Sequence, residues 1–399
     1  RFIMSLPLEG IRILAVEHYG AGPFGTMHLA DLGAEVIKIE NREVGGDSAR
    51  HVAPYLLGKN DSQFFQSMNR NKKSLTLNLK STEGREIFEK LVEKADGVTS
   101  NLRGDQPEKL RLRYSDLSHK NKKIVCAHIS AYGRTGSRSK WPGYDYLMQG
   151  ETGFMYLTGE PDGPPTRMGL SIVDWTTGIT NMLGLISGIL SAKKTGLGRD
   201  IDVSLFDTAL FQTSYTSIWY LNETHKTERT PRSAHPVIVP SQLFKAKDGW
   251  IYIMAMTEKF WSIVIETTGE TSLSSNKKFI DFKSRLENRD ELTDVLDKVF
   301  SRKTVEEWMS LLAGRIPIGP VYDLDKALDN PFVLERKMIQ EFKHPEKKVI
   351  RTLSNPIQVN GERLPVSRAP LLGEHNEEIL TELGYSKEEI KILSQNKVL

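Results

Sequence analysis

The chain has 399 residues and a formal net charge of +3, from 54 Lys and Arg against 51 Asp and Glu. This near balance gives no reason to expect nucleic acid or an anionic membrane as a partner. A chain of this length predicts two domains. It contains no apolar run of about 18 residues, so we expect no membrane-spanning segment.

The single cysteine, Cys126, lies in the apolar run 124–127, which predicts a buried strand residue rather than a catalytic thiol. One cysteine excludes a disulfide framework and a cysteine zinc site, and it indicates a cytoplasmic protein. The histidines show no H-x-x-H spacing, so no metal site is expected. We interpret Met4 as the initiator and leave the three residues before it out of the fold.

The first half of the chain alternates between strand and helix patterns. Residues 11–16 and 35–39 are expected to be strands on either side of a helix at 25–32, and such a unit implies a parallel sheet. Further strands are expected at 74–79, 98–101, 123–129 and 200–204, and further helices at 82–95, 176–191 and 205–221. The alternation predicts a large, Rossmann-like, doubly wound α/β domain over residues 4–221.

The composition changes after residue 221. Residues 222–239 are polar or rich in proline and are interpreted as a linker. A hairpin with Asp248 and Gly249 at its turn opens a small α+β domain at 240–330. Helices are expected there at 260–267, 289–301 and 305–313. Residues 331–399 are expected to return to the large domain and to end in two amphipathic helices separated by Gly384.

Residues 20–25 match the pattern G-x-G-x-x-G, and Glu40 follows twenty residues after the first glycine. This is the fingerprint of a dinucleotide site, in which the acidic residue holds a ribose hydroxyl. Two features count against it. Bulky residues at 17–19 separate the strand from the first glycine, and the cations Lys38 and Arg42 suit a phosphate better than a ribose. An NAD-dependent dehydrogenase and a protein that binds another phosphorylated cofactor both stay open at this point.

The segment 69–80 places Lys and Arg before and after a strand, beside asparagines. Such groups suit a phosphorylated ribose and a diphosphate. The alternative is a solvated surface turn.

Asp174 begins the long apolar helix and follows a loop rich in Gly and Pro at 158–165. A carboxylate at this point is a good N-cap. A nucleophile held rigidly at the mouth of the helix is the other interpretation. The chain has no G-x-S-x-G elbow and no P-loop, and position alone favours the capping role for Asp174.

Taken together, the blocks of sequence resemble the class III CoA-transferases over nearly the whole chain. The resemblance rests on residues 7–14, 21–23, 32–40, 69–74, 132–136, 143–145, 158–174, 247–249 and 370–375. It implies a large Rossmann-like parallel-sheet domain plus a smaller α+β domain, in a homodimer whose two chains are interlocked. Coenzyme A would then be a substrate, carried as acyl-CoA, with no prosthetic group.

The resemblance also implies a role for individual residues. Asp174 would attack the thioester and carry CoA as an aspartyl thioester, and Tyr144 and Asp145 would line the acyl site. CoA contacts are implied at Tyr19, Gly20, Ala21, Asn41, Arg42, Leu77, Lys80, Asn101, Leu102 and Lys109. Some members carry glutamine where this chain has Gly20 and arginine where it has Asn41, so Arg42 is a candidate substitute.

The likeness of residues 235–249 to the glutarate branch of the family favours succinyl-CoA as the donor and a small dicarboxylate as the acceptor. The nearest alternative is an acyl-CoA racemase of the same fold, which needs two acid/base groups facing the α-carbon. Racemases carry a histidine where this chain has Tyr144. A tyrosine is a poor base at neutral pH, so transfer is favoured over racemisation.

Overall fold

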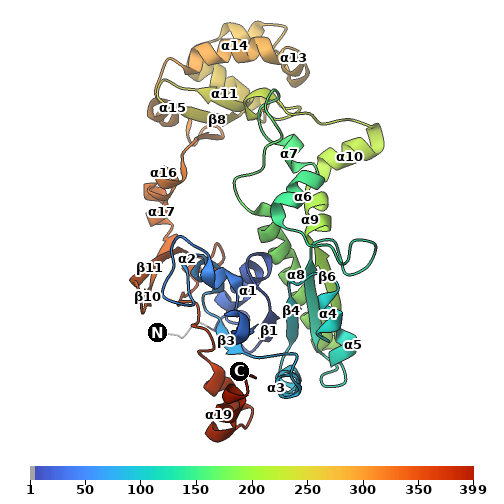
Figure 1. Ribbon diagram of the computed structural model, residues 1–399. Coiled ribbons are helices and arrows are strands. Elements are labelled where there is room, and N and C mark those ends of the chain that lie inside the picture. Colours follow the sequence, from blue (N-terminus) through green and yellow to red (C-terminus); the bar gives the residue numbers. More distant parts are fainter. Residues whose placement is uncertain (1–4) are drawn as a thin grey trace. The chain divides into compact units, whose positions relative to one another are not determined.

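The computed structural model describes residues 5–399, so the interpretation of Met4 lies outside the described residues. The described chain divides into two compact units. Unit 1 contains residues 5–152, 169–212 and 331–399, and unit 2 contains residues 153–168 and 213–330. Figure 1 shows their elements along the chain.

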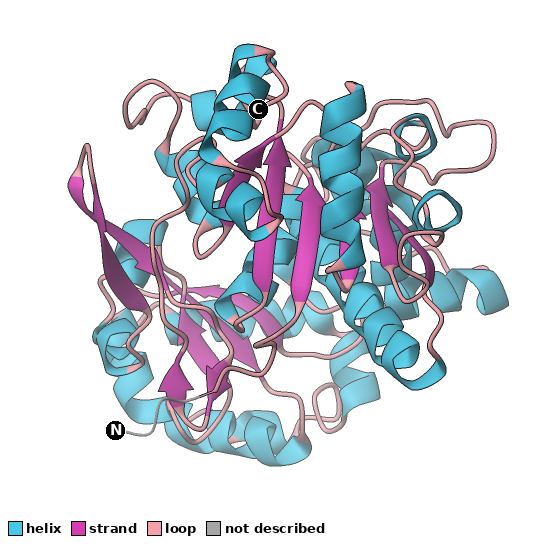
Figure 2. Ribbon diagram, turned by 90° about the horizontal axis from the view of Figure 1, so that it is seen from below, coloured by secondary structure: helices cyan, strands magenta, loops and turns pink. Residues whose placement is uncertain are grey.

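Unit 1 is built on six parallel strands in the order β3-β2-β1-β4-β5-β6. Figure 2 shows the strands of this sheet with helices packed around them. This strand order is that of the doubly wound dinucleotide-binding fold, in which the direction of winding reverses between β1 and β4. The predicted α/β fold class is therefore confirmed. The strands are β1 (Arg12–Val16), β2 (Glu35–Glu40), β3 (Lys73–Thr76), β4 (Gly97–Ser100), β5 (Val125–Ser130) and β6 (Arg199–Ser204).

The helices and smaller elements of unit 1 pack on this sheet or follow it. The α-helices are α1 (Ala21–Asp31), α2 (Gln63–Asn69), α3 (Thr82–Glu93), α4 (Gln106–Lys109), α5 (Tyr114–Leu117), α6 (Asp145–Glu151), α8 (Ile172–Thr195), α9 (Leu205–Gln212), α17 (Pro331–Glu335), α18 (Asn376–Glu382) and α19 (Lys387–Gln395). Two antiparallel hairpins complete the unit, β10 (Ile339–His344) with β11 (Lys348–Leu353) and β12 (Gln358–Val359) with β13 (Glu362–Arg363).

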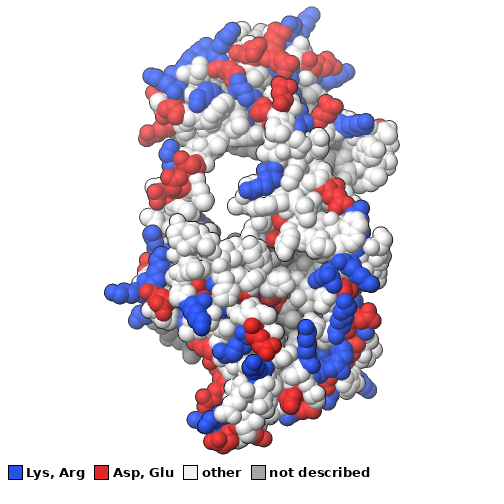
Figure 3. All heavy atoms as spheres, viewed as in Figure 1, with Lys and Arg blue, Asp and Glu red and all other residues white. Residues whose placement is uncertain are grey.

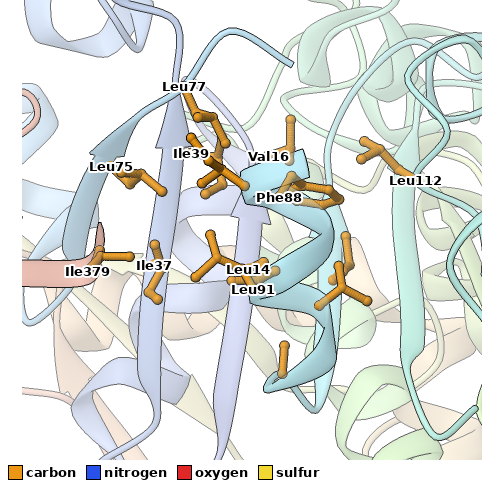
Figure 4. Packing of buried hydrophobic residues seen from close by; sticks show 14 of the residues in the cluster. Leu14, Val16, Ile37, Ile39, Leu75, Leu77, Phe88, Leu91, Leu112 and Ile379 are labelled. Carbon is orange, nitrogen blue, oxygen red and sulfur yellow. The ribbon is translucent and has the colours of Figure 1, made fainter. Parts of the chain in front are cut away.

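The alternation of side chains along β1 explains why both faces of the sheet are covered. Ile13 and Ala15 point to the face on which α1 and α8 pack. Leu14 and Val16 point to the opposite face, where they meet α3 and the C-terminal helices (Figure 4). Successive strand residues face opposite ways, so a strand buried on both sides has an unbroken apolar sequence. That is the pattern from which the strand was predicted.

The helix predicted over residues 205–221 is wrong as a single element. The structure has α9 (Leu205–Gln212) and α10 (Ser214–Glu223), which belong to different units. Ser214 adopts the left-handed conformation, with φ of 47°, and this interrupts the helix. The strand predicted to reach Leu79 ends at Thr76 instead.

Unit 2 is an α+β unit with its own core. Its sheet has three antiparallel strands, and the predicted hairpin is confirmed as β7 and β8. Phe244, Trp261, Phe300 and Trp308 are central to the core. The strands are β7 (Ser241–Lys245), β8 (Trp250–Met254) and β9 (Ile318–Pro320), and the α-helices are α7 (Phe154–Leu157), α10, α11 (Glu258–Thr268), α12 (Ser272–Ser275), α13 (Phe282–Glu287), α14 (Arg289–Phe300), α15 (Val305–Leu312) and α16 (Leu324–Leu328).

Acidic and basic side chains are interspersed over the face shown in Figure 3. Among the described helices, none is long and apolar enough to cross a membrane. Cys126 is fully buried in β5, as predicted.

Candidate active site

A pocket of about 400 Å³ opens in unit 1 where β1, β4 and β5 end. Parallel strands with this order leave a crevice outside their carboxyl ends at the point where the winding reverses, and ligands bind there. The pocket is lined by residues 18–21, 101–103, 129–131 and 141–144, together with Gln106, Asp174 and Leu205. The topology therefore gathers the loops after β1, β4 and β5 and the starts of α8 and α9 around one space.

Asp174 lies in the first turn of α8 and is not its N-cap. The cap position is taken by Ser171, whose side chain makes no capping hydrogen bond. Instead the Oδ2 atom of Asp145 accepts a hydrogen bond of 2.9 Å from the backbone N–H of Asp174. The capping role considered for Asp174 is therefore performed by Asp145, and the Asp174 carboxylate is left for other use.

Asp145 is buried at the start of α6, and both of its oxygens are engaged. Oδ1 accepts a hydrogen bond of 2.6 Å from the Nε2 atom of Gln149, one turn further along the same helix. Because its two oxygens are used in this way, Asp145 holds the start of α8 in place. It does not line the pocket that contains Asp174 and Tyr144.

No residue between 5 and 399 is seen to form an ion pair or a hydrogen bond with the carboxylate of Asp174. Burial, together with the negative charge of Asp145, raises the pKa of Asp174 to about 7. A carboxylate that is partly buried and has no cation beside it keeps its nucleophilic electron pairs unengaged. A raised pKa in a pocket is also a common feature of functional sites.

Each glycine of the 20–25 motif makes room for a specific neighbour. A β-carbon at Gly20 would lie 3.0 Å from Oδ2 of Asp174, and one at Gly22 would lie 2.9 Å from the side chain of Asn101. A β-carbon at Gly25 would lie 2.6 Å from the carbonyl oxygen of Gly178 in α8. The motif therefore brings α1 and α8 together and places the turn before α1 against Asp174.

The acidic residue of the dinucleotide fingerprint is not available to a ribose. Glu40 is buried, and Arg50 donates hydrogen bonds of 2.8 Å to both of its oxygens. Ser74 donates a further one of 2.6 Å. Glu40 thus fixes the loop after β2, which argues against the dehydrogenase interpretation.

Three cations in the segment 69–80 are also used inside the protein. Arg70 pairs with Asp31 at 2.7 Å, and Lys72 pairs with Glu17 at 2.9 Å, all four with buried side chains. Lys73 lies between two glutamates. The phosphate site inferred from these cations is therefore reduced to Lys80, which is exposed after β3.

The implied CoA contacts fall into separate places. Tyr19, Gly20, Ala21, Asn101 and Leu102 all line the pocket that contains Asp174 and Tyr144. Asn41 and Arg42 line a second pocket of unit 1, of about 380 Å³, beside the C-terminal residues.

The remaining three differ in exposure. Leu77 has a buried side chain, so only its backbone can contact a ligand. Lys80 is exposed, and Lys109 is exposed and forms an ion pair of 2.6 Å with Asp105. Arg42 is exposed, with its guanidinium against Gly373 and no carboxylate partner between residues 5 and 399. Arg42 is therefore the cation in this set best suited to a phosphate.

Some lining residues were missed in the sequence. Trp141 reaches the pocket from the loop after β5, and the guanidinium of Arg138 lies 4.8 Å from the centre of its ring. Arg103 reaches it from the loop after β4, and Gln106 from the first residue of α4. The signal that could have found them is their position just beyond the carboxyl ends of central strands.

A family model described as CoA-transferase family III matches residues 8–376. The chain belongs to CoA-transferase family III. It is 33% identical to a succinyl-CoA:glutarate CoA-transferase of Homo sapiens, over 94% of this chain and 86% of that protein. It is also 33% identical to a succinyl-CoA:mesaconate CoA-transferase of Haloarcula marismortui, over 94% of this chain and 96% of that protein.

Solved structures of the family agree with the fold. A CAIB/BAIF family protein from Brucella suis superposes with a TM-score of 0.82 at 30% identity, covering 95% of this chain and all of that one. The resemblance found in the sequence is thus confirmed, and the protein is a CoA-transferase. The family takes CoA thioesters as substrates. In the described part of the chain no group of three or more potential metal ligands occurs.

Proposed function

We propose that Asp174 is the nucleophile that carries CoA between two carboxylic acids. The observation that supports it most strongly is an unpaired carboxylate, with a pKa raised to about 7, on the wall of the pocket at the sheet's switch point. A carboxylate nucleophile needs no adjacent base, because it has no proton to lose once it is ionised. This fits residues 5–399, in which no histidine is hydrogen-bonded to Asp174.

The proposed reaction proceeds by acyl and thioester exchange. The Asp174 carboxylate attacks the donor thioester, which gives a mixed anhydride and CoA thiolate. The thiolate then attacks the aspartyl carbonyl, which gives an aspartyl-CoA thioester and releases the donor acid. The acceptor carboxylate repeats these two steps in reverse and leaves as its CoA ester. Every intermediate keeps the energy of the thioester, provided that water is excluded.

The acyl chain and the pantetheine arm of CoA are proposed to occupy the pocket between Gly20 and Tyr144. The turn 19–21 and the loop 101–102 are on one side of it and Tyr144 on the other. Arg42 and Lys80 are the exposed cations proposed for the phosphates, and an exposed Lys109 adds to the positive charge. Charge-assisted bonds from such groups are the usual means of holding a phosphate.

Succinyl-CoA is proposed as the donor and a small dicarboxylate as the acceptor. Relatives named for succinyl-CoA with glutarate or mesaconate support this, each covered over most of its length. An acetyl-CoA:oxalate CoA-transferase of Acetobacter aceti, at 33% identity, also acts on a dicarboxylate by its name. A cytoplasmic location is proposed from the single, buried Cys126.

The protein is proposed to act as a homodimer. On α8, Ile179, Leu183 and Leu190 are about half or more exposed, and their spacing of four and seven residues places them on one face. Leu210 and Phe211 of α9, which packs against α8, are exposed as well, with Phe211 at 87%. An apolar area of this kind is typical of a protein interface.

The test is chemical trapping of the aspartyl thioester. The protein is incubated with succinyl-CoA, glutaryl-CoA or acetyl-CoA plus hydroxylamine, and the peptide that contains residue 174 is weighed. We expect a hydroxamate on Asp174 with at least one donor, and no adduct in Asp174→Asn. If no donor gives an adduct while solvent deuterium enters the α-carbon of a branched acyl-CoA, the protein is a racemase instead.

A further inference from the structure

The turn between β1 and α1, residues 17–20, is held at every residue up to the glycine by side chains from elsewhere in unit 1. It is the turn that lies against Asp174, since Gly20 approaches the Asp174 carboxylate. Tyr19 has a φ of 66°, in the left-handed region that residues other than glycine rarely adopt. A conformation of this kind persists only when surrounding contacts impose it.

Asp47 holds Tyr19 in this left-handed backbone conformation. Its Oδ1 atom accepts a hydrogen bond of 2.9 Å from the backbone N–H of Tyr19 and another of 2.8 Å from the N–H of Ala49. Its own backbone N–H donates to Glu40, which Arg50 fixes in turn. Asp47 is therefore positioned by Glu40 at the end of β2, and Tyr19 is positioned by Asp47.

Lys38 supplies the positive charge that allows the Asp47 carboxylate to be buried. Its ammonium lies 2.7 Å from Oδ2 of Asp47, and both side chains have no exposed surface. It also donates a hydrogen bond of 3.1 Å to the carbonyl oxygen of Glu17, two residues before Tyr19. Burial alone would raise the pKa of Asp47, but Lys38 and the N–H groups of Tyr19 and Ala49 lower it, so the carboxylate stays ionised.

Two further contacts complete the hold on the turn. The amide of Asn101 donates to the carbonyl oxygen of His18 at 2.7 Å and accepts from its N–H at 2.9 Å. Lys72 bonds both Glu17 and the carbonyl oxygen of Pro23, at 2.9 Å each, so it joins the start of the turn to the first residues of α1.

We infer that Asp47, supported by Lys38, is a positioning residue for the transfer reaction: it fixes Tyr19 and Gly20 at the distance from Asp174 that the reaction requires. Neither residue lines the pocket, and both side chains are fully buried, so they act on the site through the turn. Lys38 thus serves the site as a buried counter-ion and not as a phosphate ligand. The inference rests on the proposed placement of the reaction at Asp174.

The test compares Asp47→Ala with a control that breaks another buried ion pair of unit 1. Asp31→Asn is that control, since Asp31 pairs with Arg70 at the far end of α1 and has no contact with the turn. Both variants should lose thermal stability. Only Asp47→Ala should lower kcat, by about 100-fold, because misplacement by about 1 Å can have that effect. KM for the acyl-CoA should rise by much less than kcat falls.

Hydrogen exchange gives a second readout that does not depend on activity. In Asp47→Ala the peptide over residues 17–24 should exchange faster than in the wild type, and in Asp31→Asn it should not. Asp47→Asn keeps an oxygen for Tyr19 but loses the pair with Lys38, so it should fall between the wild type and Asp47→Ala. If Asp47→Ala does not fold, Asp47→Asn is compared with the control in its place.

An unchanged exchange rate at 17–24, an effect confined to KM, or an equal loss of kcat in the Asp31→Asn control would overturn the inference. Failure of the proposed function is distinguishable from this. It would show as an absence of the Asp174 hydroxamate in the wild type, whereas the exchange comparison would still decide the role of Asp47.

Discussion

The backbone N–H of Asp174 donates a hydrogen bond of 2.9 Å to the carboxylate of Asp145, which comes from another helix, 29 residues earlier in the chain. The same carboxylate adds to the rise in the pKa of Asp174, after burial, which is the larger cause. Asp145 therefore both places the proposed nucleophile and makes it harder to ionise. The two effects can be separated, because an amide with its oxygen toward Asp174 keeps that hydrogen bond and removes the charge, although it gives up the bond from Gln149.

Asp145→Asn should shift the acid limb of the kcat/KM profile to lower pH. Without the neighbouring charge the pKa of Asp174 falls, so the reactive carboxylate forms at a lower pH. At the plateau the rate should stay within about fivefold of the wild type, since exchanging a charged acceptor for a neutral one costs on the order of 1 kcal/mol. Rates are measured from pH 5 to pH 9. The control is Asp202→Asn, since Asp202 pairs with Arg134 and does not line the pocket. A shift to higher pH in Asp145→Asn would contradict the prediction.

Asp174→Asn should make the protein more stable, and the gain should grow with pH. Because the folded state raises the pKa of Asp174 from 3.8 to about 7, ionisation in the unfolded chain destabilises the fold progressively as the pH rises from about 4 to 7. Each pKa unit corresponds to about 1.4 kcal/mol, so above pH 7 the free energy of unfolding of Asp174→Asn should exceed that of the wild type by on the order of a few kcal/mol. Below pH 4 the two proteins should unfold at the same urea concentration.

Asp200→Asn is the control of opposite sign. Burial alone would raise the pKa of Asp200, but His128, the N–H of Tyr114 and Arg134 lower it. Its stabilising effect is present above the unfolded pKa, so this variant should become less stable than the wild type as the pH rises. If the stabilities of both variants, relative to the wild type, change with pH in the same direction, the conclusion that Asp174 has no cationic partner is wrong.

The strands of unit 1 could be predicted because each is short and either mostly apolar, as in β1, or alternating between polar and apolar residues, as in β6. The break between α9 and α10 could not, since the sequence around Ser214 has no proline or glycine to mark it. The same limit applies to the charges. Lys72 pairs with Glu17 across 55 residues, and a cation that will be buried looks no different in sequence from one that faces solvent.

The candidate site was predictable only in part for the same reason. The glycines at 20–25 were found, but their purpose depends on α8, more than 150 residues away in the chain. Sequence spacing could suggest a dinucleotide turn because that motif is local. The contacts that argue against it, from Arg50 and Ser74 to Glu40, are tertiary ones.

Gly178→Ala should reduce both stability and turnover. A β-carbon there would lie 2.3 Å from the carbonyl oxygen of Ala21, and backbone atoms cannot move aside as a side chain does. The overpacking should cost about 1–3 kcal/mol of unfolding free energy. It should also displace α8 and lower kcat by about 100-fold.

Gly184→Ala is the matched control in the same helix. Its β-carbon would meet only the γ2 methyl group of Ile201 in β6, at 2.8 Å, and no atom of α1, so any strain falls on β6 and not on the contact between α1 and α8. Its kcat should stay near that of the wild type. Equal kcat values for the two variants would show that the close approach of α1 and α8 does not place Asp174.

Tyr144→Phe decides between transfer and racemisation. Tyr144 lines the pocket with Asp174 and is 69% exposed, so removing its hydroxyl should not disturb the fold. CoA transfer through Asp174 moves no proton, so kcat for transfer should stay within about fivefold of the wild type. A racemase that uses this position as its second acid/base group would lose about 10²- to 10⁴-fold in its racemisation rate.

The measurements are CoA transfer from succinyl-CoA to glutarate and deuterium uptake at the α-carbon of a 2-methylacyl-CoA. Deuterium uptake by the wild type that disappears in Tyr144→Phe would favour the racemase, because proton removal would then depend on the one hydroxyl that transfer does not need.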